Sequence, residues 1–157
     1  MAAQYSFITK WQIKAPVERV WEAIYNSNSW PTWWKGVLQV TDICNGDENG
    51  IGDVKNITWK SVLPYKLSFK MKLVEKEMYK KLTGIAFGEL QGNGTWYFKQ
   101  ENDITYVEYY WNVITTKKWM NVLSFILKPA FKYNHNVVMH WGAEGLAKKL
   151  NAELVSY

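Results

Sequence analysis

The sequence predicts an α+β domain in which a curved, seven-stranded antiparallel sheet wraps around one long C-terminal helix, with two short helices between strands one and two. Over residues 116–150, apolar side chains recur at three- and four-residue spacing, which gives a helix about 50 Å long with one apolar stripe. Residues 36–114 contain strand-length segments separated by turn residues, with no helical period between them. Without alternating helices, such strands pair as an antiparallel meander.

The N-terminal segment predicts the first strand and the two short helices. Residues 4–13 alternate apolar and polar side chains, with Ile8 as the exception, and Pro16 ends this strand. Residues 17–24 carry apolar side chains on one helical face. Pro31 begins another helical turn within the segment Trp30 to Trp34, whose three tryptophans either plug the end of the sheet or rim an opening.

The turn residues predict how the middle strands pair. The two-residue turn Asn102-Asp103 pairs Phe98 with Val107, Trp96 with Tyr109 and Gly94 with Trp111. A second turn at Gly92-Asn93 places Glu89 opposite Trp96 and Phe87 opposite Phe98. A three-residue turn at 78–80 then places Leu73 opposite Ile85 and Met71 opposite Phe87. In this register all of these apolar side chains share the inner face of the sheet.

Pro129 lies inside the long helical pattern. Proline removes one backbone hydrogen bond and clashes with the carbonyl group four residues earlier, so we expect a kink near Phe125.

Composition limits the classes of function. A chain of 157 residues is expected to form one domain, residues 1–157. Aromatic residues make up 17%, which indicates either a bulky core or a cavity lined by aromatic rings. The net charge of +5 is spread along the chain with no nucleic-acid-binding motif, so no nucleic-acid partner is expected. The single Cys44 and the absence of long apolar runs predict a cytoplasmic protein without an integral membrane segment; the oligomeric state is not fixed by the sequence.

Five segments match one known family: IKAPVERVWEAI (13–24), WPTWWKGV (30–37), GELQGNGTWYF (88–98), TYVEYYWNV (105–113) and FKYNHNVVMHWGAEGL (131–146). With these segments the chain resembles the START-like (SRPBCC) superfamily, in particular its polyketide cyclase/dehydrase and lipid-transport branch. The resemblance implies a helix-grip fold with an apolar ligand held between sheet and helix. Some members catalyse cyclisation or dehydration and others carry a ligand, and no universal catalytic signature can be transferred.

The inner face of the predicted sheet and the helical stripe give the candidate ligand-binding residues, which are Trp59, Tyr65, Phe69, Trp96, Tyr109, Trp111, Asn134, Val138 and Trp141.

Glu89 and His135 are the candidate catalytic residues. In the predicted register Glu89 lies beside Trp96 and Phe69, where burial would raise the pKa of its carboxyl group; a bulge at Gly88 or Gly92 would instead turn it outward. His135 either bonds a strand end from the flank of the helix, or faces the cavity and orients a ligand or transfers a proton. His135 and His140 lie about 140° apart around the helix, so no metal site is expected, and no cofactor.

Three functions remain open from the sequence. The first is binding or transport of a hydrophobic small molecule, such as a lipid or a polyketide-like compound. The second is a cyclase or dehydratase acting in the same cavity through Glu89, His135 or a tyrosine. The third is a protein-interaction module that uses the Trp30 to Trp34 segment.

Overall fold

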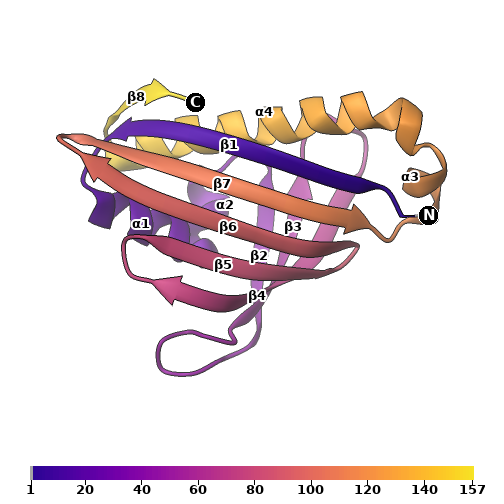
Figure 1. Cartoon of the computed structure of the whole chain (residues 1–157), viewed down its shortest axis with the longest axis horizontal. Coiled ribbons are helices and arrows are strands. Elements are labelled where there is room, and N and C mark those ends of the chain that lie inside the picture. The colour runs from indigo at the N-terminus through magenta and orange to yellow at the C-terminus, as the bar shows by residue number, and fades with distance from the viewer. Residues whose placement is uncertain (1) are drawn as a thin grey trace.

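The computed structural model describes residues 2–157, which form one antiparallel sheet wrapped around a C-terminal helix (Figure 1). In chain order the elements are β1 (Gln4–Lys14), α1 (Val17–Tyr25), the 3₁₀ turn η1 (Ser27–Ser29), α2 (Trp30–Trp33), β2 (Val37–Cys44), β3 (Val54–Lys60), β4 (Lys66–Glu77), β5 (Lys81–Gly88), β6 (Leu90–Glu101), β7 (Ile104–Thr115), α3 (Lys118–Val122), α4 (Ser124–Leu150) and β8 (Glu153–Ser156). The predicted α+β architecture is therefore confirmed, including the short helices between the first two strands.

The sheet of residues 2–157 has eight strands in the order β2-β3-β4-β5-β6-β7-β1-β8, so the prediction of seven strands is wrong by one. The additional strand, β8, pairs antiparallel with the end of β1. Asn151 ends α4 in the left-handed conformation, with φ of 50°, and this reverses the chain toward β1. Four residues with two apolar side chains are too short to give an alternating sequence pattern.

The C-terminal helical segment is divided at Leu123. The backbone N–H groups of Ile126 and Leu127 both donate to the carbonyl oxygen of Leu123, so α4 starts anew after the short α3. The prediction of one continuous helix from Thr116 is therefore wrong, although Pro129 does lie inside α4. Because Phe125 is exposed, water can satisfy the carbonyl oxygen that Pro129 leaves without its helical donor.

The predicted pairing of β6 with β7 is confirmed at every position named above, including Trp96 with Tyr109. The predicted pairing of β5 with β6 is wrong. The chain reverses at Gly88, with φ of 112°, while Gly92 lies inside β6 and pairs with Ala86. Trp96 therefore pairs with Leu82 and not with Glu89.

A β-bulge explains the second error in register. The turn at residues 78–80 forms as predicted and pairs Glu77 with Lys81. Val74 is then an extra residue in β4, so Leu73 pairs with Gly84 and Met71 with Ala86. This shift by one residue exchanges the two faces of β5, and Ile85 and Phe87 point outward, where both are exposed.

The interior contains two apolar clusters. The larger one joins α1, α2 and the C-terminal half of α4 to the sheet, and its most deeply buried side chains include Trp11, Trp34 and Leu146. The smaller one lies toward α3 and includes Trp111, Met120 and Phe131. The candidate site lies between the two clusters.

Candidate ligand-binding site

A cavity of about 150 Å³, called here the first cavity, lies between the sheet and α4. Residues from both apolar clusters line it, and together they are Tyr5, Phe7, Trp30, Trp34, Trp59, Tyr65, Leu67, Phe69, Leu90, Trp96, Tyr109, Trp111, Val113, Met120, Phe131, Asn134, His135, Val138 and Met139. None of these side chains carries a formal charge at neutral pH, so the first cavity is an apolar space with a few polar atoms.

Most of the sequence-predicted ligand-binding residues border this cavity, namely Trp59, Tyr65, Phe69, Trp96, Tyr109, Trp111, Asn134 and Val138. Trp141 does not. It lies on the flank of α4, with the Nζ atom of Lys35 4.4 Å from the centre of its ring.

Two aromatic residues of the lining were not predicted from the sequence. Tyr5 and Phe7 lie on β1 opposite Val113 and Trp111 of β7, so their side chains share the inner face of the sheet. The alternation in residues 4–13 carried this signal, but without the pairing of β1 to β7 it did not place these rings in the site.

Trp30 and Trp34, two of the three tryptophans in the α2 segment, also border the first cavity. Trp34 is 1% exposed, and its Nε1 atom donates to the carbonyl oxygen of Val138 at 2.8 Å. Trp30 is likewise buried and donates to the carbonyl oxygen of Ile24. These two side chains fill the interior, whereas Trp33 is half-buried and Pro31 and Thr32 are exposed.

Several polar atoms in the cavity wall are buried without a hydrogen-bond partner among residues 2–157. They are the hydroxyl of Tyr5, the Nε1 atom of Trp59 and both ring nitrogens of His135. A buried polar group without a partner costs about 1–3 kcal/mol, so each is a favourable contact point for a polar atom of a ligand. Asn134 differs, because its Oδ1 atom accepts from the hydroxyl of Ser61.

His135 is held as a neutral ring. Its imidazole stacks on Phe7 with the ring centres 4.1 Å apart, and burial lowers its pKa from 6.5 to about 4. At pH 7 one ring nitrogen therefore donates and the other accepts. This arrangement fits the prediction of a cavity-facing polar group and not that of a histidine bonded to a strand end.

The tyrosine hydroxyls remain protonated. Burial raises the pKa of Tyr65 to about 12, with the nearby Tyr5 adding to the shift, and burial also raises the pKa of Tyr5 and Tyr109. At neutral pH these groups are therefore uncharged hydrogen-bonding groups.

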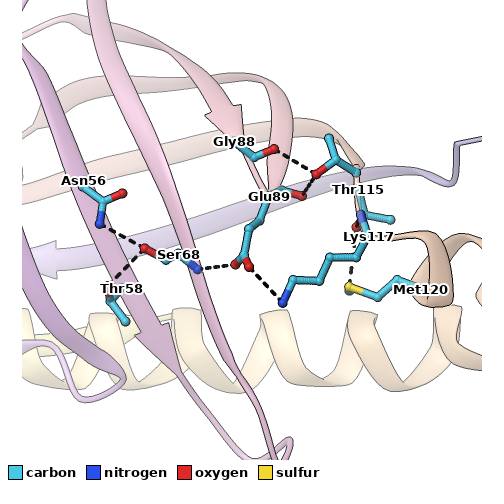
Figure 2. A network of polar contacts seen from close by, with 9 residues as sticks. Asn56, Thr58, Ser68, Gly88, Glu89, Thr115, Lys117 and Met120 are labelled. Atoms are coloured by element: carbon cyan, nitrogen blue, oxygen red, sulfur yellow. Dashed lines mark hydrogen bonds and ion pairs between the residues drawn. The ribbon is translucent and has the colours of Figure 1, made fainter.

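Glu89 lies outside the cavity, in the turn between β5 and β6, as Figure 2 shows. Its Oε2 atom accepts from the backbone N–H of Ser68 at 2.7 Å, and its Oε1 atom lies 3.0 Å from the Nζ atom of Lys117. Its carbonyl oxygen accepts from Thr116. The predicted position beside Trp96 is wrong, and the carboxylate instead joins β4 and the β5–β6 turn to the segment that leads into α3.

A second cavity of about 400 Å³ lies between the end of α1 and strands β3 to β6. It shares five aromatic side chains with the first cavity, and these are Trp30, Trp59, Phe69, Trp96 and Tyr109. Its lining also includes Glu22, Asp53 and Lys55, so it is the more polar of the two. The two cavities are adjacent, with the shared aromatic rings at their common border.

Gly94 permits the rings to lie close to the sheet. A Cβ atom at this position would lie 2.4 Å from the hydroxyl of Tyr109 and 2.7 Å from the ring of Trp111. The room beside Gly94 is therefore filled by aromatic rings.

Among residues 2–157, no three His, Cys, Asp or Glu side chains lie together in a way that would hold a metal ion. None of the helices in this part of the chain is long and apolar enough to cross a membrane.

The geometry described so far, a curved antiparallel sheet gripping a C-terminal helix around a cavity, is that of the START-like (SRPBCC) fold. Solved structures match it over nearly the whole chain. The Zhui aromatase/cyclase from Streptomyces sp. R1128 is similar with a TM-score of 0.76 at 8% identity, over 95% of this chain and 94% of that one. A START superfamily protein from Mycobacterium smegmatis gives 0.73 at 9% identity, over 94% and 97%.

Norcoclaurine synthase from Thalictrum flavum, solved in complex with dopamine and hydroxybenzaldehyde, gives a TM-score of 0.59 at 10% identity, over 94% of this chain and 86% of that one. No protein-family model and no curated protein sequence matches the chain. At these identities the similarities show the fold, and the START-like fold inferred from the sequence is confirmed.

Proposed function

We propose that the 157-residue chain is a single ligand-binding domain that binds a hydrophobic small molecule carrying one or two uncharged polar groups. The observation that carries this proposal is the chemistry of the first cavity, which combines an apolar wall with buried, unpartnered polar atoms of Tyr5, Trp59 and His135. An apolar pocket with a few convergent polar groups is the usual form of a small-molecule site.

The size of the cavities limits the ligand. Small-molecule sites usually measure about 300–1,000 Å³, so the first cavity alone suits one ring or a short chain. The second cavity, at about 400 Å³, falls in that range and offers Lys55 and Asp53. A ligand that extends past the shared aromatic rings would place its apolar part in the first cavity and its polar end in the second.

Tryptophan fluorescence tests the proposal directly. Five of the ten tryptophans border the first cavity, so a bound ligand changes the emission of a large share of them. Titration with a fused-ring aromatic compound and with a medium-chain lipid should give saturable quenching.

A matched pair of variants locates the binding site. Val138 lines the first cavity, whereas Val62 is 51% exposed. Val138→Phe should weaken binding about tenfold or more, and Val62→Phe should leave it unchanged. Absence of saturable quenching in the wild-type protein, or equal affinity in the two variants, would overturn the proposal.

A second candidate function is a cyclase or dehydratase that acts in the same cavity. Two observations support it: the similarity to an aromatase/cyclase, and the neutral imidazole of His135, which can accept a proton from a ligand. Product analysis by mass spectrometry, with a poly-β-ketone thioester analogue as substrate, tests it. Turnover that is lost in His135→Ala, while ligand affinity is retained, would establish the enzyme. Unchanged substrate in the wild-type reaction would leave binding alone.

A further inference from the structure

One end of the molecule exposes a group of large apolar side chains, which we call the apolar tip. It comprises Trp119, Val122, Leu123, Phe125, Ile126 and Tyr133 of α3, α4 and the junction between them. The exposed fractions reach 78% for Phe125, 73% for Val122 and 61% for Ile126, so most of the surface of these side chains is uncovered, while Trp119 also contacts the ring of Tyr65. Figure 1 shows α3 and the first turns of α4 at one end of the molecule, next to the N-terminus.

The apolar tip is distinct from the cavity-facing side of the same helices. Along α4, Ile126, Pro129 and Tyr133 follow at three- and four-residue spacing and share the outer face, whereas Phe131 faces the first cavity. The lining of the cavity therefore does not explain the outer apolar residues. Grouped exposed apolar side chains of this kind mark an interaction surface.

The charges around the tip are all of one sign. Lys118, Lys128 and Lys132 are exposed there, and none of them forms an ion pair among residues 2–157. The sequence contains no acidic residue between Glu108 and Glu144. Glu89, the carboxylate that reaches this segment, is already paired with Lys117.

We propose that the apolar tip docks on an anionic lipid surface, with the apolar side chains inserted at the interface and the three lysines on the phosphate or carboxylate groups of the lipids. Two features favour this partner over a protein groove. The first is the position of the tip at one end of the molecule, which suits a broad planar surface. The second is the combination of aromatic and aliphatic side chains with unpaired lysines, which is typical of peripheral membrane-binding helices. Without a membrane-crossing helix in residues 2–157, the attachment is peripheral and reversible.

This docking is separate from ligand binding but places the cavity near the lipid. Met120 of α3 and Phe131 of α4 line the first cavity from the inside, directly behind the tip. A hydrophobic ligand would then exchange between cavity and membrane over a short apolar path.

Vesicle flotation of the full chain tests the proposal. The probes are vesicles of pure phosphatidylcholine and of phosphatidylcholine with phosphatidylserine. The wild-type protein should float with the anionic vesicles, float much less with the neutral ones, and dissociate as the salt concentration rises. Phe125→Ser with Ile126→Ser should reduce partitioning about tenfold or more. Each of Lys128→Gln and Lys132→Gln should reduce it about fivefold.

Matched controls come from other faces of the molecule. Ile8 on β1 is 63% exposed, nearly the same as Ile126, so Ile8→Ser should bind vesicles as the wild type does. Lys148→Gln and Lys149→Gln, made one at a time, each alter one charge at the far end of α4 and should have little effect. Circular dichroism and ligand titration in solution should be unchanged in the tip variants, which separates this test from that of the proposed function.

Four outcomes would overturn the docking proposal. The first is wild-type protein that stays unbound on anionic vesicles. The second is equal binding of the wild type to neutral and anionic vesicles. The third is equal binding by the tip variants and the wild type. The fourth is a wild-type dimer, seen by analytical ultracentrifugation, that dissociates in Phe125→Ser with Ile126→Ser while neither protein binds lipid, which would make the tip an interface between copies.

Discussion

Protonation of His135 should destabilise the fold as the pH falls. Its pKa is about 4 in the folded protein and 6.5 when unperturbed, so the unfolded chain binds the proton more readily. A group whose pKa is depressed by folding contributes its full stability above pH 6.5 and loses it as the pH falls toward 4. The complete shift corresponds to about 3 kcal/mol, and the loss between pH 7 and pH 5 is about 2 kcal/mol.

Urea denaturation at pH 7 and pH 5, followed by circular dichroism, measures this loss. The pH change acts on the whole protein, so the informative quantity is the difference between the wild-type protein and His135→Phe. The variant keeps a ring that can stack on Phe7 and removes two buried nitrogens without partners. We expect the variant to lose about 2 kcal/mol less than the wild type between the two pH values.

The control for this experiment is Ile8→Ser. Ile8 is 63% exposed on β1 and carries no titratable group, so this variant should keep the wild-type pH dependence. If His135→Phe and the wild type lose the same free energy of unfolding between pH 7 and pH 5, the imidazole is not held neutral by burial, and the reasoning is refuted.

Three further predictions concern the turn at Glu89, the packing of α4 and the charge of the ligand. Glu89→Ala removes the acceptor for Ser68 and the partner of Lys117 and should lower the free energy of unfolding by about 1–2 kcal/mol, whereas Glu89→Gln should lower it less; a loss of ligand affinity with unchanged stability would contradict this structural role. Gly142→Ala should lower the free energy of unfolding, measured by urea denaturation, by about 1–3 kcal/mol, because the added Cβ would lie 2.5 Å from the indole of Trp34. An unchanged free energy of unfolding would show that α4 moves easily away from Trp34. At pH 7, 1-naphthol should bind about tenfold or more tightly than 1-naphthoate in fluorescence titrations, because no cationic side chain lines the first cavity; equal affinities would point to a site elsewhere.

The sequence predicts those parts of the fold in which one local signal has no competitor. Asn102-Asp103 is the turn between two long alternating segments, and Asn102 takes a positive φ of 56° there, so the pairing of β6 with β7 followed directly. Residues 88–94 contain two competing turn signals, at Gly88 and at Gly92-Asn93. Local propensity does not choose between these two turns. The chain turns at Gly88 because Gly92 pairs with both β5 and β7.

The candidate site was predictable to the same extent. Trp96, Tyr109 and Trp111 lie on strands with the correct register, and Val138 lies on the helical stripe, so periodicity placed them at the cavity. Met120 lies on a short helix and Trp34 at the end of another, and both border the first cavity. In such short segments the sequence shows no periodicity, and tertiary packing decides where a side chain points. The bulge at Val74 likewise leaves no mark in residue type, yet it decides which face of β5 is inside.

The displacement of Glu89 from the cavity decides what chemistry the cavity can support. Beside Trp96 the carboxylate would be buried without a cation, at a cost of several kcal/mol or with loss of its charge. At the turn it instead accepts a hydrogen bond from a backbone N–H and forms an ion pair with a lysine. Of the two candidate catalytic groups, only His135 lines the first cavity. Its imidazole is neutral at pH 7, so one of its ring nitrogens can accept a proton. Substitution of His135 therefore distinguishes the two proposed functions. If the protein is a carrier, the substitution should alter ligand affinity; if it is an enzyme, the substitution should abolish turnover.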